Sequence, residues 1–304
     1  MLKLHHRYTI EELKSSQKFL KERKLVEVLL DKSSINKKDI VYEIGPGKGI
    51  ITECLAKRCK KVTAIELDKK LYERLKSRFR GNTSIEIKFG DFLQYQLPRK
   101  QKYKIFSNIP FNLTADIVRK LTLDGTFLLE AFLIVQKEAA ERFTGFPYSK
   151  ETQISLLLKP KFDLKILHNF RKSDFEPKPR VDVVLLGITR RKEFLVRENQ
   201  KQMYRDFIVY GFSQWKESLR KAFKKIFTYR QFIRLAGDLN FSKEAKPADL
   251  SFEQWMGLFR YFLKGVDVSK KFDVIGAETD KQVQVANSSL RKGYKRESAR
   301  EYNI

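Results

Sequence analysis

Short apolar runs alternate with segments of helical periodicity over the first 185 residues of the chain. Runs rich in β-branched and aromatic side chains predict strands over residues 40–44, 62–65, 85–89, 103–106, 129–135 and 181–188. Apolar positions at helical spacing predict helices over residues 19–31 and near 49–58, 68–79, 114–121, 137–143 and 150–159. This alternation is typical of an α/β fold in which helices cover both faces of a mostly parallel sheet.

The chain becomes helical and aromatic from about residue 196. Helices are predicted over residues 203–225, 229–239 and 251–264, and aromatic residues recur there as in a buried core: Trp215, Phe223, Phe232, Trp255 and Phe259. Residues 267–304 are polar and charged without sustained periodicity, so we expect a disordered tail. The sequence therefore predicts a sheet domain over residues 1–190, a small all-helical domain over 191–266 and a tail over 267–304.

An excess of basic residues narrows the class of partner. The chain has 63 Lys and Arg against 37 Asp and Glu, which gives a net charge of +26. A surplus this large favours a polyanionic partner, and the interleaved aromatic residues favour nucleic acid over a membrane surface. No apolar run is long enough for a transmembrane helix, and Cys54 and Cys59 lack the partners of a zinc site. We therefore expect a cytoplasmic protein with reduced thiols, no membrane partner and no metal.

Glycines and polar residues follow four successive predicted strands, at the point where each strand ends. The strand over 40–44 leads into a turn that contains Gly45 and Gly47, and glycines let a ligand approach the backbone closely. The next two strands lead to Glu66, whose carboxylate suits the hydroxyls of a ribose, and to Asp91, which could accept from an adenine amino group. The fourth ends at Asn108. Because the carboxyl ends of parallel strands share one edge of a sheet, these residues would line one crevice.

The segment Asn108-Ile109-Pro110-Phe111 adds candidate chemistry at that crevice. Pro110 lacks a backbone donor and favours an extended residue before it, so the strand should end here and leave carbonyl groups unpaired. A flipped-out base with an exocyclic amine requires a stacking ring and hydrogen-bond acceptors, which this segment offers. The alternative is structural: a strand that runs into a proline turn, with acids such as Asp68 and Asp91 serving only as helix N-caps.

Together these segments resemble the S-adenosylmethionine-dependent rRNA adenine N6-methyltransferases. Within them the closer resemblance is to the Erm family, which methylates 23S rRNA and confers resistance to macrolides, lincosamides and streptogramin B. The resemblance covers residues 15–265 and includes Lys102–Asn112, the Pro-x-Pro-x-Val-Asp run at 177–182, and pieces of the helical domain at 225–228 and 251–254. It implies a Rossmann-like class I S-adenosylmethionine-dependent methyltransferase domain followed by a small all-helical C-terminal domain.

The resemblance implies a binding site for S-adenosyl-L-methionine. Gly45 and Gly47 would hold the methionine end of the cofactor, Glu66 its ribose and Asp91 its adenine. The N-terminal motif of the family, Gln-Asn-Phe, is Gln17-Lys18-Phe19 here, so an ammonium group replaces an amide beside a sulfonium cofactor. The full implied cofactor set is Lys18, Leu20, Gly45, Gly47, Glu66, Asp91 and Asn108.

The resemblance also implies a catalytic motif, formed by Asn108, Ile109, Pro110 and Phe111. The side-chain oxygen of Asn108 and the backbone carbonyl of Ile109 would accept hydrogen bonds from the target amine. The ring of Phe111 stands where the family usually has tyrosine, and it would stack on the target adenine. No carboxylate is expected to act as a strong base beside Asn108, so orientation of the amine would provide most of the rate enhancement.

The implied partner is 23S rRNA, bound by a monomer before full ribosome assembly. Lys178 and Arg180 lie in an extended Pro-x-Pro loop and would contact its phosphates. Two other functions stay open: a housekeeping small-subunit rRNA adenine dimethyltransferase, whose usual motif is Asn-Leu-Pro-Tyr, and a catalytically silent RNA-binding protein on the same fold. The presence of Gly47, Glu66 and Asn108 favours an enzyme.

Overall fold

The computed structural model describes residues 18–213 and 218–279, and these residues form two compact units. The first unit contains the described residues up to Thr144 together with Phe162–Lys192. The second contains Gly145–Lys161 and the described residues from Glu193 onward. Residues 145–161 therefore belong to the helical unit rather than to the sheet domain expected from the sequence. Leu156, in this segment, is fully buried in the core of the helical unit. Its contacts are with residues distant in sequence, which local periodicity does not encode.

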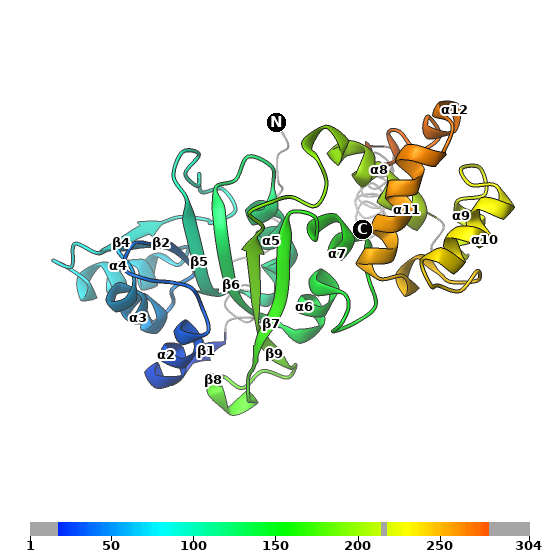
Figure 1. Ribbon diagram of the computed structural model, residues 1–304. Helices are drawn as coiled ribbons and strands as arrows, with labels where there is room; N and C mark the ends of the chain where they lie inside the picture. Colours follow the sequence, from blue (N-terminus) through cyan, green and yellow to red (C-terminus); the bar gives the residue numbers. More distant parts are fainter. Residues whose placement is uncertain (1–17, 214–217, 280–304) are drawn as a thin grey trace, which may run out of the picture. The chain divides into compact units, whose positions relative to one another are not determined.

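A seven-stranded sheet forms the centre of the first unit, in the order β4-β3-β2-β5-β6-β9-β7 (Figure 1). Its strands are β2 (Ile40–Ile44), β3 (Lys61–Glu66), β4 (Ile85–Phe89), β5 (Tyr103–Asn108), β6 (Leu128–Gln136), β7 (Phe162–Asn169) and β9 (Val183–Arg190). Neighbours from β4 to β6 run parallel, whereas β9 pairs antiparallel with both β6 and β7. The prediction of a mostly parallel sheet is confirmed.

Strand β7 is missing from the strands predicted above. It lies at one edge of the sheet, where β9 is its neighbour. Phe162 and Leu164 are buried and alternate with the less buried Asp163 and Lys165. This alternation is the pattern of a half-buried edge strand, so a signal was present in the sequence.

Helices connect the parallel strands, since parallel neighbours require a crossover. These are α3 (Ile50–Arg58), α4 (Lys69–Arg78) and α5 (Thr114–Thr122); α6 (Lys137–Thr144) follows β6, and α2 (Arg23–Asp31) precedes β2. Helices α2 and α3 bury Leu29 and Leu55 in one apolar cluster with Phe106 of the sheet. The helices predicted near 49–58, 68–79, 114–121 and 137–143 are confirmed to within a few residues.

The helix predicted over residues 19–31 is wrong at its beginning. Phe19 and Leu20 form a short strand, β1 (Phe19–Leu20), and the helix begins only at Arg23. Strand β1 pairs antiparallel with β8 (Phe175–Glu176), which follows a 3₁₀ turn, η2 (Lys172–Asp174). Leu20 is opposite the fully buried Phe175. A partner so distant in sequence overrides the helical spacing of the local apolar residues.

The second unit is helical. Its elements are α7 (Gln153–Leu158), η3 (Glu198–Gln200), α8 (Lys201–Phe212), α9 (Leu219–Ala222), α10 (Tyr229–Asp238), η4 (Pro247–Asp249), α11 (Phe252–Gly265) and α12 (Val268–Lys271). The expected core aromatics Phe223, Phe232, Trp255 and Phe259 are buried together, and Trp215 lies outside the described residues. The single helix predicted over 203–225 is wrong, because α8 ends at Phe212 and α9 begins at Leu219.

The start of the expected disordered tail is ordered. Val274 is fully buried, and the carboxylate of Asp206 in α8 accepts hydrogen bonds from the backbone amides of Gly276 (3.2 Å) and Glu278 (3.0 Å). Arg205 forms an ion pair with Glu278. The disorder prediction is therefore wrong for residues 267–279, and residues 280–304 lie outside the described part of the chain. Among the described residues, no helix combines the length and apolarity needed to cross a membrane.

Candidate active site

The four predicted strand ends lie side by side at the carboxyl edge of the sheet. Strands β4, β3, β2 and β5 are consecutive neighbours and run parallel. The amide of Gly45 donates to the carbonyl of Ile65 (2.9 Å), and the amide of Gly90 donates to the carbonyl of Glu66 (2.9 Å). These two bonds tie the turns after β2, β3 and β4 together. Gly45, Glu66, Asp91 and Asn108 are thus brought to one edge, as the sequence predicts.

The turn after β2 requires glycine for two different reasons. Gly45 and Gly47 have φ angles of +61° and +57°, in the left-handed region that side chains disfavour. A Cβ atom added to Gly47 would lie 2.6 Å from a ring carbon of Phe19, so close packing excludes a side chain there. A Cβ atom added to Gly45 would meet nothing within 4 Å. The open space beside Gly45 leaves room for a ligand to contact the backbone.

The carboxylate of Glu66 is held in place by two backbone amides. Its Oε2 accepts from the amide of Gly47 (3.1 Å) and its Oε1 accepts from the amide of Asp68 (2.9 Å). The side chain is buried, and burial raises the pKa of the Glu66 carboxyl while these hydrogen bonds lower it. Each oxygen retains a second lone pair. The group is therefore a fixed acceptor that could receive hydrogen bonds from two adjacent hydroxyls.

One pocket, open to solvent, lies over the ends of β3 and β4. Polar groups of Glu66, Asp68 and Asp91 lie on an otherwise apolar lining of Ile44, Ile65, Leu67, Phe92, Leu93, Pro110, Leu113 and Ile117. The Oδ1 of Asp91 accepts from the amide of Leu93 (2.8 Å), which fixes the carboxylate. Asp68 caps α4 through the amides of Lys70 and Leu71, so the N-cap interpretation holds for Asp68. A flat apolar space with acceptors on its rim suits an adenosine group.

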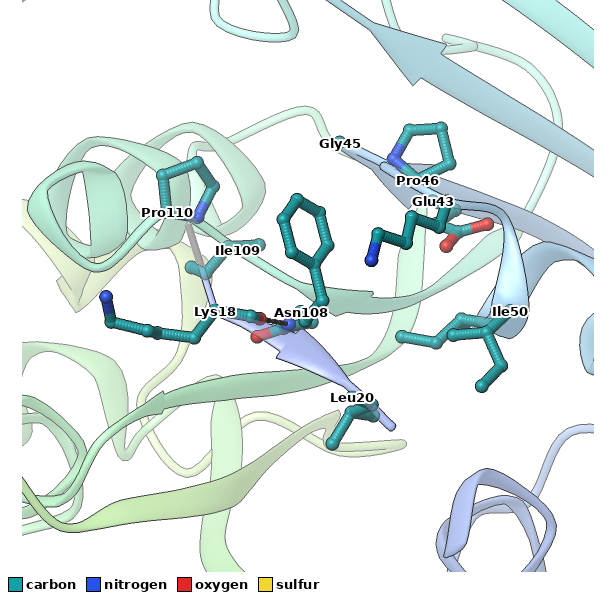
Figure 2. Close-up of a pocket in the computed structure, with 12 residues that line it drawn as sticks. Lys18, Leu20, Glu43, Gly45, Pro46, Ile50, Asn108, Ile109 and Pro110 are labelled. Atoms are coloured by element: carbon teal, nitrogen blue, oxygen red, sulfur yellow. Dashed lines mark hydrogen bonds between the residues drawn. The ribbon is translucent and has the colours of Figure 1, made fainter. Parts of the chain in front are cut away.

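A second pocket (Figure 2) adjoins the first, and the two share Gly45 and Pro110. Its lining is Lys18, Phe19, Leu20, Glu43, Gly45, Pro46, Lys48, Ile50, Ile51, Asn108, Ile109 and Pro110. Figure 2 shows Ile109 and Pro110 on one side of this pocket and Glu43 and Pro46 on the other. One elongated ligand could extend from the first pocket, past Gly45, into the second.

Asn108 lies at the base of the second pocket. Its Nδ2 donates a hydrogen bond to the backbone carbonyl of Lys18, drawn as the dashed line in Figure 2. The preceding residue, Ser107, is buried and accepts from the amide of Ile44 (3.1 Å), which fixes the end of β5 against β2. Because the donor side of the Asn108 amide is bound to Lys18, its oxygen is oriented away from that bond. The cofactor candidates Lys18 and Leu20 line the same pocket.

Phe111 differs from its neighbours in the motif. It begins the 3₁₀ turn η1 (Phe111–Leu113), its carbonyl accepts from the hydroxyl of Thr114 (2.8 Å), and its ring is partly buried against the apolar cluster of α2 and α3. Asn108, Ile109 and Pro110 line the second pocket, whereas Phe111 does not. Stacking on a target base stays a prediction for this ring.

Glu43 is a residue of the pocket that the sequence analysis did not select. It is only 1% exposed, and its Oε2 accepts from the hydroxyl of Thr52 (2.6 Å). Burial, with a smaller contribution from the neighbouring Glu66, raises the pKa of the Glu43 carboxyl to about 8. The side chain is therefore largely protonated at neutral pH. A carboxylate within the otherwise apolar strand over 40–44 was the available signal.

Lys178 and Arg180 lie apart from both pockets. Both side chains are exposed, in the segment that follows β8, and Pro179 between them is buried. The carbonyl of Arg180 accepts from Nζ of Lys172 (3.3 Å), so this loop is fixed at one point while its two cations face solvent. Their contact with phosphate stays a prediction.

The parallel sheet, the glycine turn and the fixed acceptors at its carboxyl edge define a class I S-adenosylmethionine-dependent methyltransferase. Residues 11–264 match the family model described as ribosomal RNA adenine dimethylase, and the chain belongs to that family. It is 32% identical over 252 residues to an rRNA adenine N-6-methyltransferase of Limosilactobacillus reuteri, covering 83% of this chain and 97% of that protein. An enzyme of the same description from Escherichia coli is 32% identical over 256 residues, covering 83% of this chain and 97% of that protein.

Two solved structures share the fold. The 23S rRNA methyltransferase ErmE superposes with a TM-score of 0.75 at 24% identity, covering 81% of this chain and 100% of that one. A dimethyladenosine transferase from Plasmodium falciparum superposes with a TM-score of 0.63 at 22% identity, covering 82% and 98%. The chain is thus an S-adenosylmethionine-dependent rRNA adenine N6-methyltransferase, and the silent RNA-binding alternative is set aside.

Proposed function

We propose that this enzyme methylates N6 of an adenine in the peptidyl-transferase region of 23S rRNA and so confers resistance to macrolides, lincosamides and streptogramin B. The proposal rests on Ile109, where the small-subunit enzymes usually have leucine, and on the segments 225–228 and 251–254, which resemble the helical domain of the Erm family. The name of ErmE, a structural neighbour, agrees with this substrate. The enzyme would act as a cytoplasmic monomer, on rRNA that is not yet fully assembled into ribosomes.

The chemistry follows from the orientation of Asn108. Its Nδ2 is bound to the Lys18 carbonyl, so Oδ1 is available to accept a hydrogen bond from the target amine. The lone pair of adenine N6 is delocalised into the ring, and hydrogen bonds from its protons to Oδ1 and to the Ile109 carbonyl favour a more tetrahedral nitrogen. An amine held in this way is positioned for in-line attack on a methyl group. After the transfer, the nitrogen loses one proton to solvent.

The cofactor fits the two joined pockets. Glu66 would accept from the ribose hydroxyls, Asp91 from the adenine amino group, and the backbone at Gly45 would contact the methionine end. The open space at Gly45, where an added Cβ would meet nothing, supports this placement. When bound, S-adenosylmethionine supplies an electrophilic methyl group on a sulfonium. Lys18 and Lys48 also line the second pocket, so ammonium groups would border a cofactor whose sulfonium is itself cationic.

The test is primer extension on 23S and 16S rRNA from cells that express the chain, beside cells that express Asn108→Ala. We expect a stop in the peptidyl-transferase region of 23S rRNA that is absent with the variant and is accompanied by macrolide resistance. Because a single methyl group on the adenine does not always stop the polymerase, the same rRNA fragment is also analysed by mass spectrometry. A mark found only near the 3′ end of 16S rRNA would refute the 23S assignment and identify the housekeeping small-subunit enzyme instead.

A further inference from the structure

A lysine-lined hollow lies at the opposite edge of the sheet from the active site. It is open to solvent and is lined by Lys38, Asp39, Ile40, Lys60, Lys100, Gln101, Lys102, Tyr103, Phe127 and Leu129. These residues precede or begin β2, β3, β5 and β6. The hollow is therefore at the amino ends of four parallel neighbours. Strands of five or six residues rise by about 17–20 Å, which is the separation between this hollow and the catalytic edge.

The charge of the hollow is positive and unbalanced. Lys38, Lys60, Lys100 and Lys102 are exposed, and none of them forms an ion pair with another residue of the described chain. The single acid of the lining, Asp39, already pairs with the buried Lys104, whose Nζ is 3.1 Å from its Oδ2. Four ammonium groups thus surround a space with no free carboxylate among its described residues.

Lys104 offsets part of the negative charge near this hollow. Its Nζ also lies 3.0 Å from Oε2 of Glu130, and it donates to the hydroxyl (2.6 Å) and carbonyl (3.0 Å) of Ser34. Its side chain is only 8% exposed. One buried ammonium offsets only one of the two carboxylates, so this group keeps a net charge of about −1. The four exposed lysines outweigh it, so a ligand would meet a net positive charge of about +3.

The walls of the hollow are fixed by backbone hydrogen bonds. The amide of Lys60 donates to the carbonyl of Asp39 (2.9 Å), and the amide of Tyr103 donates to the carbonyl of Phe127 (3.3 Å). Phe127, which is 39% exposed, and Leu129 add apolar surface to the lining. Cations around an exposed ring are the composition of surfaces that bind RNA backbone and stack an unpaired base.

We infer that this hollow is a second contact surface for the rRNA substrate, which binds the phosphate backbone remote from the target adenine. The established substrate class is rRNA, and a folded RNA domain is large enough to contact both edges of one sheet. The four lysines would each neutralise a phosphate and release counterions, so they would strengthen binding without touching the reacting atoms. The inference rests on the proposed function only in taking 23S rRNA, rather than 16S rRNA, as the RNA that binds.

The test compares two quadruple variants as full-length proteins. One is Lys38→Gln, Lys60→Gln, Lys100→Gln and Lys102→Gln; the control is Lys24→Gln, Lys32→Gln, Lys69→Gln and Lys70→Gln, which removes the same charge from exposed lysines elsewhere in the first unit. Wild type is first assayed on transcripts of the 23S peptidyl-transferase domain and of the 16S 3′ domain. The transcript that it methylates is used for both variants, so a wrong 23S assignment is detected separately.

We expect the hollow variant to bind that transcript at least about tenfold more weakly near 0.1 M salt. The slope of log K against log salt should fall by about 0.7 to 0.9 for each phosphate that the variant no longer neutralises. Its kcat at saturating RNA and its melting temperature should match those of the control. Binding and slope equal to those of the control would overturn the inference, and would leave an acidic protein partner as the better ligand for the hollow. An equal weakening in both variants would also overturn it, because it would show a general effect of charge.

Discussion

The side-chain amide of Asn108 donates a hydrogen bond to the backbone carbonyl of Lys18, 90 residues earlier in the chain. Asn108 ends β5, whereas Lys18 directly precedes β1. Strand β1 is in turn paired with β8, and the loop with Lys178 and Arg180 follows β8 directly. The orientation of the candidate catalytic amide therefore depends on a backbone segment that is connected to the proposed RNA-binding loop.

Removal of the Asn108 amide should greatly slow methyl transfer and spare RNA binding. We expect Asn108→Ala to lower kcat by about 10²- to 10³-fold, the usual loss when one preorganised hydrogen-bonding group is deleted. The dissociation constant for rRNA should change little, because phosphate contacts provide most of that affinity. Single-turnover methylation and filter binding on the same RNA measure the two quantities.

A variant at an exposed asparagine outside the pockets, Asn36→Ala, controls for the loss of an amide as such. It should retain the wild-type rate of methyl transfer. Full activity in Asn108→Ala would remove this residue from the mechanism, and a joint loss of activity and RNA binding would point to misfolding rather than chemistry.

Elements with strong local periodicity could be predicted from the sequence. The strands over 40–44 and 85–89 have the predicted bounds, since short apolar runs between turn residues determine them locally. The crevice was predictable for the same reason: once the strands are parallel, Gly45, Glu66 and Asn108 must meet at one edge. The hydrogen bonds from Gly45 to Ile65 and from Gly47 to Glu66 support that placement, although the ligand roles stay predictions.

What escaped prediction depends on contacts between distant segments. Phe19 and Leu20 become a strand because Phe175 and Glu176 pair with them, and no local signal specifies that partner. The order of residues 267–279 likewise depends on a distant helix. The backbone amides of Gly276 and Glu278 donate hydrogen bonds to Asp206, which lies in α8 about 70 residues earlier in the chain. Polar composition alone made this segment resemble a disordered tail.

Two glycines with similar backbone conformations provide a matched test of the cofactor site. Gly45 (φ +61°) and Gly81 (φ +84°) both have room for a Cβ atom within the protein. Gly45→Ala and Gly81→Ala should therefore cost similar stability, about 1 kcal/mol each, from left-handed strain. Only Gly45→Ala should weaken S-adenosylmethionine binding, by about tenfold or more, because only there would the methyl group occupy ligand space. Calorimetric titration measures the cofactor affinity, and urea unfolding measures the stability. Equal cofactor affinity in the two variants would refute the placement of the cofactor at Gly45.

The loop after β8 should contribute to RNA affinity through charge. We expect Lys178→Ala combined with Arg180→Ala to weaken rRNA binding and to lower the slope of log K against log salt by about 1.4 to 1.8, the value for two phosphates. Lys69→Ala with Arg74→Ala, both exposed on α4, is the control for net charge. The measurement is rRNA binding across a series of salt concentrations. If the slope of log K against log salt is no lower than that of the control, the loop is excluded from the RNA contact surface.

The buried carboxyl of Glu43 predicts a pH dependence of stability. Burial raises its pKa in the folded enzyme to about 8, well above the ~4.3 of an exposed Glu in an unfolded chain. Between these values the folded state binds a proton that the unfolded state lacks. Its stabilising contribution is therefore complete below about pH 4 and is lost as the pH rises towards 8, at up to ~1.4 kcal/mol per pH unit.

Glu43→Gln should remove this dependence, because an amide has the same shape, can accept from the hydroxyl of Thr52 and does not ionise. The free energy of unfolding by urea, measured between about pH 5 and about pH 8, should fall less steeply in Glu43→Gln than in wild type. Glu66, whose pKa burial also raises, leaves a residual slope in both proteins. Glu73→Gln changes an exposed carboxyl of α4 and should keep the wild-type slope. If Glu43→Gln also kept that slope, the Glu43 carboxyl would have to be ionised in the folded enzyme, and the second pocket would then contain a negative charge beside the cofactor's methionine end.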